Sequence, residues 1–464
     1  MHPACLAARK IIMKAPNYIT RTIPAGSLTT VLAAALALCL GVSGCGEKIE
    51  DPKPSENVAI FYIAGYNSLY SYLRDDVYDL CTSTLPTDAN GEDVVLVYSR
   101  IAPSSNFKDG TPSALFRLYR SRKKASDGTY PIVRDTLLRF DALHRACSSE
   151  TITEVLNYAK ANFPSKRYGM LFSSHGRGWV PNGYYVDPKP PVSFAPSLRQ
   201  SSSGPALPDG AHVYVEPDYE EGDIVTKSIG EDIGYVGSTK VSYEMEIEDF
   251  ASAIPYKLDY LLVDACLMGG VEFAYALRGK VGIVGFSQAE VLADGFDYKK
   301  VVSQLCTGAE PLPLDVCKDY YSLYNSQSGP HHSATISAVD CDKISSLASV
   351  CKTLFEKYRS EIASLDVDSV QGYSGGNKKW FFDLEDVLLK AGISDSEKAQ
   401  LSAALEDCVP YKGCTGQYYT VTEKKALEVK HFCGLSMFMP SAGNEYLDGY
   451  YKALQWNEAT GLIR

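Results

Sequence analysis

The sequence lacks an excess of basic residues, a C-x-x-C pair and an apolar run long enough to cross a membrane. Its 45 lysines and arginines are scattered and outnumbered by 56 acidic residues, giving a formal net charge of −11, which argues against a nucleic-acid partner. Without C-x-x-C, a cysteine zinc site has no basis. With 464 residues, 45% hydrophobic and 22% charged, the chain is neither disordered nor coiled coil, so we expect one large globular domain and a smaller one.

The N-terminus carries the signs of an export signal. Basic residues precede an apolar run from Leu28 to Val42, which is shorter than the roughly 20 residues of a membrane-spanning helix. The run ends in Val42-Ser43-Gly44-Cys45, which resembles the lipobox of bacterial lipoproteins and implies cleavage before Cys45 and its lipidation. We expect a signal peptide over residues 1–45 and a polar tether over 46–57.

The mature protein is then expected in the bacterial cell envelope, attached to a membrane through its lipid, either in the periplasm or on the cell surface. Met13 is an equally good start. An ordinary secretory signal and an uncleaved anchor are the alternatives to the lipobox.

Cysteine usage does not settle the disulfides. Of thirteen cysteines, Cys5 and Cys39 leave with the signal and Cys45 is lipidated, so ten remain. A free thiol at Cys266 would leave an odd number. The envelope permits disulfides, but spacing does not give their connectivity, and a pair such as Cys408 with Cys414 is one guess among several.

From Val58 onward, apolar runs typical of buried strands alternate with helical patterns. A capping-box pattern, Thr151-x-x-Glu154, opens one of the helices. The alternation predicts an α/β fold with a mostly parallel sheet flanked by helices on both faces. Strands are expected at 58–63, 94–98, 168–172, 260–263 and 281–286, and helices at 69–80, 151–163, 245–254 and 271–277.

Two stretches depart from this alternation. Residues 184–239 are rich in Pro, Gly, Ser and acidic residues and show no clear period, so we expect a long surface excursion. Beyond a soft boundary near residue 300, which separates a first domain (58–300) from residues 301–464, helical patterns dominate. They indicate a mainly helical C-terminal subdomain, with helices at 314–324, 344–358 and 394–405 and strands at 333–339 and 435–439.

Two motifs follow predicted strands, Ser173-Ser174-His175-Gly176 and Asp264-Ala265-Cys266-Leu267-Met268-Gly269-Gly270. Parallel strands end at one sheet edge, where sites form, so His175 and Cys266 are expected to meet there. A thiolate at Cys266 would be favoured by the predicted helix start at 269–270. Gly176 and the backbone around Cys266 would supply oxyanion donors. For either residue alone, an inert structural role is the commoner case.

Together with Tyr62–Asn67, Ile229–Asp232 and Gly434–Pro440, these motifs are similar to signatures of the clostripain family of cysteine peptidases, in the caspase-like clan. The resemblance covers most of the mature chain and implies a caspase-like fold, with the peptidase domain over residues 58–300. It implies that Cys266 attacks the scissile carbonyl with His175 as acid–base partner and no third residue. It also implies protein or peptide substrates cut after Arg or Lys.

Carboxylates at the base of the substrate pocket would explain a preference for Arg or Lys before the cut bond. Asp264 precedes the nucleophile within the family motif, and Asp294 follows the next predicted strand at the same edge. The alternative is that both are loop carboxylates facing water.

The resemblance further implies a zymogen that cuts itself in the loop after the histidine. Lys189, Arg199 and Lys227 all lie in the excursion. Pro190 makes the bond after Lys189 a poor candidate, and the polar run around Arg199 makes that site the most accessible.

This chemistry requires no cofactor, and only the family resemblance suggests that the protein binds calcium. The acidic run 216–223 lacks the EF-hand spacing, and His331-His332 has no partner at metal-ligand spacing, so we predict no metal residues. We expect a monomer. The rival functions are a non-catalytic surface lipoprotein that binds peptides or glycans on this scaffold, and a cysteine hydrolase acting on another acyl substrate.

Overall fold

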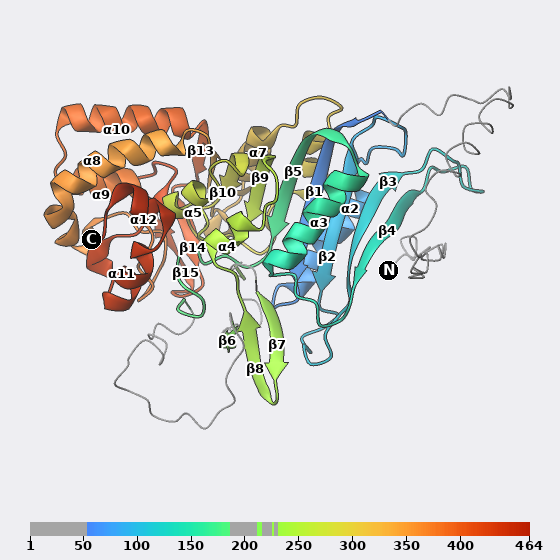
Figure 1. The fold of residues 1–464 in the computed structure, drawn as a ribbon, viewed down its shortest axis with the longest axis horizontal. Coiled ribbons are helices and arrows are strands. Elements are labelled where there is room, and N and C mark those ends of the chain that lie inside the picture. The colour runs from blue at the N-terminus through green and yellow to red at the C-terminus, as the bar shows by residue number, and fades with distance from the viewer. Residues whose placement is uncertain (1–52, 186–210, 216–224, 227–230) are drawn as a thin grey trace, which may run out of the picture. The chain divides into compact units, whose positions relative to one another are not determined.

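The computed structural model describes residues 53–185, 211–215, 225–226 and 231–464. At its centre is a nine-stranded sheet with the strand order β13-β11-β10-β9-β5-β1-β2-β3-β4 (Figure 1). The five central strands are parallel: β10 (Val281–Phe286), β9 (Leu258–Asp264), β5 (Ser165–Ser173), β1 (Ser55–Gly65) and β2 (Val94–Ile101). The predicted mostly parallel α/β fold is confirmed.

The central parallel strands are apolar on both faces because helices cover both sides of the sheet. In β1, every residue from Val58 to Ala64 is at most 1% exposed, which only a sheet covered on both sides can provide. β1 begins at Ser55, so the last residues of the predicted tether belong to this strand.

Antiparallel strands complete both edges of the sheet. β3 (Ser113–Arg120) and β4 (Ile132–Phe140) extend it beyond β2. The sequence analysis missed both; in β4 most side chains are exposed or half-buried, so no buried apolar run marks it. On the opposite edge, β11 (Thr335–Asp340) and β13 (Tyr411–Cys414) come from the C-terminal region.

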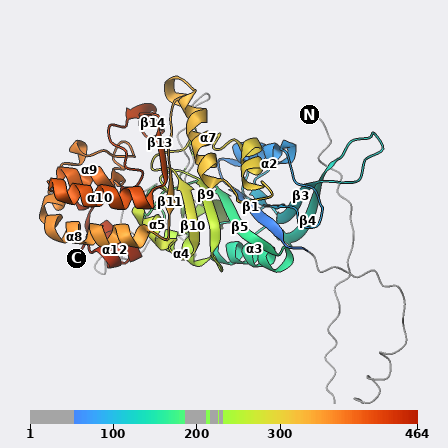
Figure 2. The ribbon, with the colours of Figure 1, turned by 90° about the horizontal axis from the view of Figure 1, so that it is seen from above.

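Helices cover the two faces of the sheet, as Figure 2 shows. On one face lie α2 (Tyr70–Thr82) and α7 (Pro313–Asn325), with α6 (Tyr298–Leu305) packed against both. On the other lie α3 (Ser149–Asn162), α4 (Ile247–Ser252) and α5 (Val271–Ala276).

The predicted cap of α3 is wrong. Ser148 is the N-cap, and its hydroxyl accepts a hydrogen bond from the Thr151 N–H at 3.2 Å. Thr151 is buried, and its own hydroxyl donates to the Arg145 carbonyl at 2.6 Å. Serine and threonine three positions apart can both start a helix, and here the serine does so.

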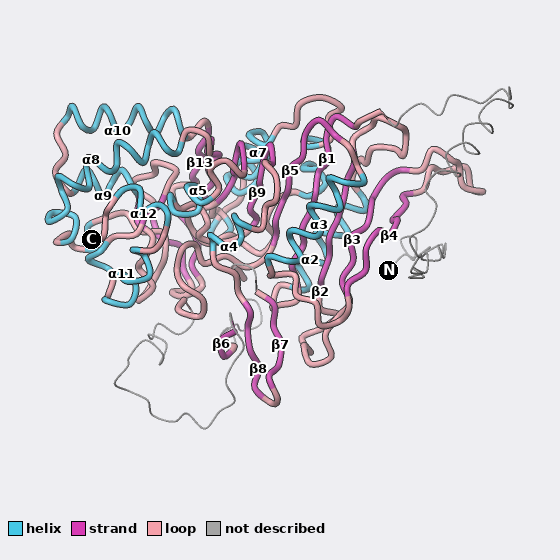
Figure 3. Tube along the Cα trace, in the orientation of Figure 1, coloured by secondary structure: helices cyan, strands magenta, loops and turns pink. Residues whose placement is uncertain are grey.

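The remaining C-terminal helices gather beyond β13, where Figure 3 shows them in cyan. The same region contains two small sheets, in which β12 pairs with β16 and β14 pairs with β15. The soft boundary near residue 300 stays a prediction. Among the described residues, no helix has both the length and the apolar character that a membrane crossing needs. The helices are α8 (Ile344–Ala363), α9 (Leu384–Lys390), α10 (Asp395–Cys408), α11 (Glu445–Lys452) and α12 (Gln455–Thr460), and the short strands are β12 (Phe382–Asp383), β16 (Ser436–Met437), β14 (Gln417–Thr420) and β15 (Lys425–Glu428).

Part of the predicted excursion has regular structure. β7 (Asp232–Val236) and β8 (Thr239–Tyr243) form a hairpin, and β6 (Ala211–Val213) pairs with β8. The hairpin projects below the main sheet in Figure 1. Cys408 and Cys414, the pair considered for a disulfide, are both free thiols, so that guess is wrong.

Candidate active site

His175 and Cys266 follow two neighbouring parallel strands in the same register. β5 and β9 pair up to Ser173 and Asp264, which lie opposite each other, and His175 and Cys266 each come two residues later. The two residues are 4% and 2% exposed. From β1 the sheet continues to β2 on one side and to β5 on the other. The carboxyl ends of the strands at such a switch point are the usual place for a site in an open α/β sheet.

Gly176 packs directly on the nucleophile loop. A Cβ atom at this position would lie 2.0 Å from the Cys266 carbonyl oxygen and 2.6 Å from its nitrogen. No side chain fits in that space, so glycine is what allows the backbones of the two motifs to touch.

The segment after β10 supports Cys266. The N–H of Val291 donates to the Cys266 Sγ atom at 3.1 Å, and the N–H of Leu267 donates to the Ala289 carbonyl at 3.0 Å. Leu267 has a φ of 61°, an uncommon conformation that functional sites often contain. The expected helix dipole contributes little because α5 has six residues; the Val291 N–H is the nearer source of positive charge for a thiolate.

Two side chains approach the Nε2 atom of His175. The Oγ atom of Ser68, in the loop after β1, lies 2.8 Å away, and the Oε2 atom of Glu231 lies 3.8 Å away. Asn67 links the loop after β1 to the segment before β7, because its Nδ2 donates to the carbonyls of Ala64 at 2.9 Å and of Glu231 at 3.0 Å. Burial raises the pKa of Glu231 to about 8.

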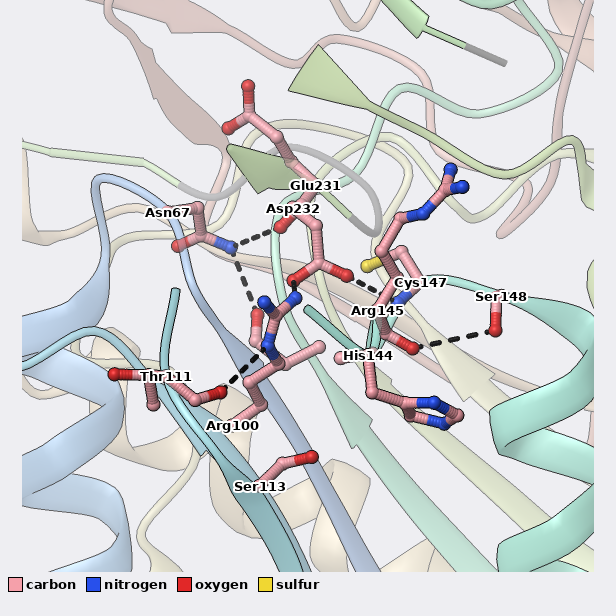
Figure 4. A network of polar contacts seen from close by, with 12 residues as sticks. Asn67, Arg100, Thr111, Ser113, His144, Arg145, Cys147, Ser148, Glu231 and Asp232 are labelled. Atoms are coloured by element: carbon pink, nitrogen blue, oxygen red, sulfur yellow. Dashed lines mark hydrogen bonds and ion pairs between the residues drawn. The ribbon is translucent and has the colours of Figure 1, made fainter. Parts of the chain in front are cut away.

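Figure 4 shows how the start of β7 is held to the main sheet. Asp232 forms a buried ion pair with Arg100 of β2 at 2.5 Å and accepts a hydrogen bond from the Cys147 N–H at 2.8 Å. Arg100 also donates to the Ala142 carbonyl at 3.1 Å. The carboxyl groups of Glu231 and Asp232 point in different directions, so Asp232 anchors the segment while Glu231 stays near His175.

The two predicted specificity carboxylates differ in exposure. Asp264 is 0% exposed, and its Oδ2 atom accepts hydrogen bonds from the Tyr298 hydroxyl at 2.8 Å and the Ser173 hydroxyl at 3.2 Å. Asp294 is exposed. Burial raises the pKa of Tyr324 well above its ordinary value, and the negative charges of Asp264 and Asp294 both add to that effect.

A short piece of the excursion lies against the segment after β10. The Val225 carbonyl accepts a hydrogen bond from the Ala293 N–H at 2.9 Å, and Thr226 pairs with Leu292 in an antiparallel bridge. The Thr226 hydroxyl donates to the Oε2 atom of Glu290 at 2.7 Å. These contacts lie directly before Asp294. Lys227 follows Thr226 in sequence but lies outside the described residues, as do Lys189, Arg199 and Cys45.

Sequence reasoning assigned no role to Ser68, Glu231 or Glu290. Polar residues in loops are too common for the first and last to stand out. The β-branched pair Val225-Thr226 directly before Lys227 was a usable signal, because β-branched residues favour extended pairing.

Among the residues that the structure describes, no group of three or more His, Cys, Asp or Glu side chains is arranged to hold a metal ion. The acidic run 216–223 lies outside them.

The chain matches one protein family and several solved structures. The model of the clostripain family matches residues 61–190 and 219–459, most of the chain. An inactive zymogen of a C11 protease from Parabacteroides distasonis is 23% identical, with a TM-score of 0.65 over 88% of this chain and 99% of that one. The secreted C11 cysteine protease iotapain from Bacteroides thetaiotaomicron is 21% identical, with a TM-score of 0.65 over 88% and 100%. These structures share the fold. No curated protein matches the sequence significantly.

Proposed function

The chain belongs to the clostripain family of cysteine peptidases, and we propose that it cuts proteins or peptides after Arg or Lys, with Cys266 as nucleophile and His175 as acid–base partner. One observation carries the proposal. The two residues stand two positions beyond an opposed pair in adjacent parallel strands, and their loops touch at Gly176.

The chemistry follows from the groups present. The Cys266 thiolate attacks the scissile carbonyl carbon, and the resulting oxyanion collapses to a thioester as the C–N bond breaks. His175 gives a proton to the departing amine. Water, giving a proton to His175, then attacks the thioester, and the C–S bond breaks, which releases the acid product and restores the Cys266 thiolate beside protonated His175. The Val291 N–H, 3.1 Å from Sγ, supports the thiolate form at the start of this cycle.

Asp264 and Asp294 are proposed to receive the cationic side chain before the cut bond. Asp264 ends β9 and Asp294 follows the adjacent parallel strand β10, and this placement at one sheet edge supports a common pocket. Asp264 accepts hydrogen bonds from Tyr298 and Ser173, whereas Asp294 is exposed. A buried negative charge gains most from a cation that replaces lost hydration.

We propose self-cleavage after Lys227 rather than Arg199 or Lys189. Val225 and Thr226 pair in extended form with Leu292 and Ala293, as a peptide substrate pairs with the edge of a protease site. Lys227 is the next residue, and the pairing ends beside Asp294, one of the carboxylates proposed to hold its side chain.

Sequencing the fragments of purified protein tests this assignment. Wild type is expected to yield a fragment that begins at Ser228, and Cys266→Ala is expected to remain whole. Lys227→Gln should block that cut, while the matched Arg199→Gln should leave it unchanged. A cut after Arg199 with residue 227 still linked to residue 228 would contradict the choice of site. A Ser228 terminus in Cys266→Ala incubated alone would contradict self-cleavage.

We also propose that Cys45 carries a lipid that holds the enzyme at a bacterial membrane. Support comes from the lipobox-like ending of the apolar run. Labelled palmitate should be incorporated into the protein and be lost in Cys45→Ser, with Cys39→Ser as control. Equal labelling of both variants and wild type would exclude Cys45 as the acceptor.

A further inference from the structure

We infer that Glu290 forms a subsite that selects a hydroxyl side chain, threonine or serine, at the substrate residue directly before the Lys or Arg that is cut. The inference rests on the proposed function and on the assignment of Lys227 as a cut site. It names a preference that the dyad and the acidic pocket do not explain.

The position of Glu290 relative to the paired segment is the first support. Thr226 lies opposite Leu292 in an antiparallel bridge, and Glu290 precedes Leu292 by two residues. In extended chains, residues two apart project to the same face. Glu290 therefore lies on the side to which the Thr226 side chain projects, and their oxygen atoms are 2.7 Å apart.

The surroundings of Glu290 explain why a hydroxyl is needed. The residue is 3% exposed. Its Oε1 atom accepts from the Thr420 hydroxyl at 2.6 Å, and its Oε2 atom accepts from the Val421 N–H at 3.2 Å as well as from Thr226. Burial raises the pKa of Glu290, and the positive charge of Lys378 acts in the opposite direction.

A substrate with valine at this position has the shape of threonine but lacks the donor. The carboxyl group then loses one of its three hydrogen bonds in a buried place, where water does not replace it freely. Sites built to hydrogen-bond a substrate hydroxyl discriminate strongly against analogues that lack it. Serine keeps the donor and loses a methyl group, so it should rank between threonine and valine.

Four fluorogenic peptides that differ only in Thr, Ser, Val or Ala before a terminal Lys test the subsite. The enzyme is the full chain after its own processing. We expect kcat/KM for the Thr peptide to exceed that for the Val peptide by about tenfold, as one hydrogen bond to a charged group suggests. Glu290→Ala should bring the Thr/Val ratio close to one, while Glu406→Ala, at an exposed carboxylate on α10, should preserve it.

Each outcome decides something. Equal Cys266-dependent cleavage of the Thr and Val peptides overturns the subsite and leaves the proposed function intact. Loss of all Cys266-dependent cleavage overturns both. If Glu290→Ala does not fold, the wild-type ratios still decide, and Thr226→Val in the full chain gives a second readout. Its self-cleavage should slow by about the same factor, and an unchanged rate would contradict the inference.

Discussion

The Nε2 atom of His175 lies 2.8 Å from the Oγ atom of Ser68. A hydrogen bond at one ring nitrogen fixes the orientation of an imidazole. Ser68 is therefore expected to act as a positioning residue for His175, although the family resemblance implied that no third residue is needed.

Replacing Ser68 with alanine should lower kcat about five- to tenfold, the value of one neutral hydrogen bond, with little change in KM. Ser68→Thr keeps the hydroxyl and should retain most of the activity. Steady-state kinetics on a Lys peptide checks this. An unchanged kcat and pH profile in Ser68→Ala would show that the contact does not position the ring.

Gly176→Ala should lower activity by roughly a hundredfold or more, because its Cβ would overlap the Cys266 backbone at 2.0 Å and misplaced reacting groups cost about that much. The matched control is Gly449→Ala, since a Cβ there meets nothing within 4 Å. Kinetics combined with thermal unfolding separates catalysis from stability. Wild-type activity in Gly176→Ala would mean that the two loops do not need to touch.

Asp294→Asn should weaken cleavage after both Lys and Arg by about fivefold, mainly through KM, because an exposed carboxylate contributes a modest attraction. Asp264→Asn should have a larger effect because Asp264 is buried. Asp315→Asn, at a carboxylate on α7 whose side chain is 44% exposed, is the control. Equal kinetics for Asp264→Asn and wild type would remove Asp264 from the pocket.

The raised pKa of Glu231 predicts that the free energy of unfolding depends on pH. Its pKa is raised from 4.5 to about 8 in the folded protein, so the folded state keeps a proton that the unfolded state releases. Its stabilising contribution is complete below pH 4.5 and falls as the pH rises to about 8. Glu272, with a pKa raised to about 7 by burial, acts in the same direction.

The urea midpoint should therefore decline between pH 5 and pH 8, and decline less in Glu231→Gln, which does not titrate. Comparing the two slopes isolates Glu231 from Glu272. Parallel slopes for the variant and wild type would show that Glu231 has an ordinary pKa in the folded protein.

The sequence was sufficient for features that depend on local apolar pattern. The buried runs of β1, β9 and β10 and the helices between them could be predicted because parallel strands covered on both faces are continuously apolar. The meeting of the His175 and Cys266 loops followed from topology, since both come after strands of one parallel sheet.

Other features depend on contacts between distant segments and could not be read locally. β4 is half-exposed and lacks an apolar signature. The contacts of Glu290 with Thr226 and Thr420 join residues 64 and 130 positions apart. Asp232 shows the same limit, because its partner Arg100 is 132 positions away. No period or motif encodes such pairs.

The most direct test of the account is hydrolysis of fluorogenic peptides ending in Arg, Lys or Asp by the processed protein, beside Cys266→Ala and His175→Ala. We predict cleavage of the Arg and Lys peptides by wild type, none of the Asp peptide, and a loss of at least a thousandfold in either variant, as for removal of a nucleophile or its base. Cleavage that persists in Cys266→Ala, or a preference for the Asp peptide, would contradict the account.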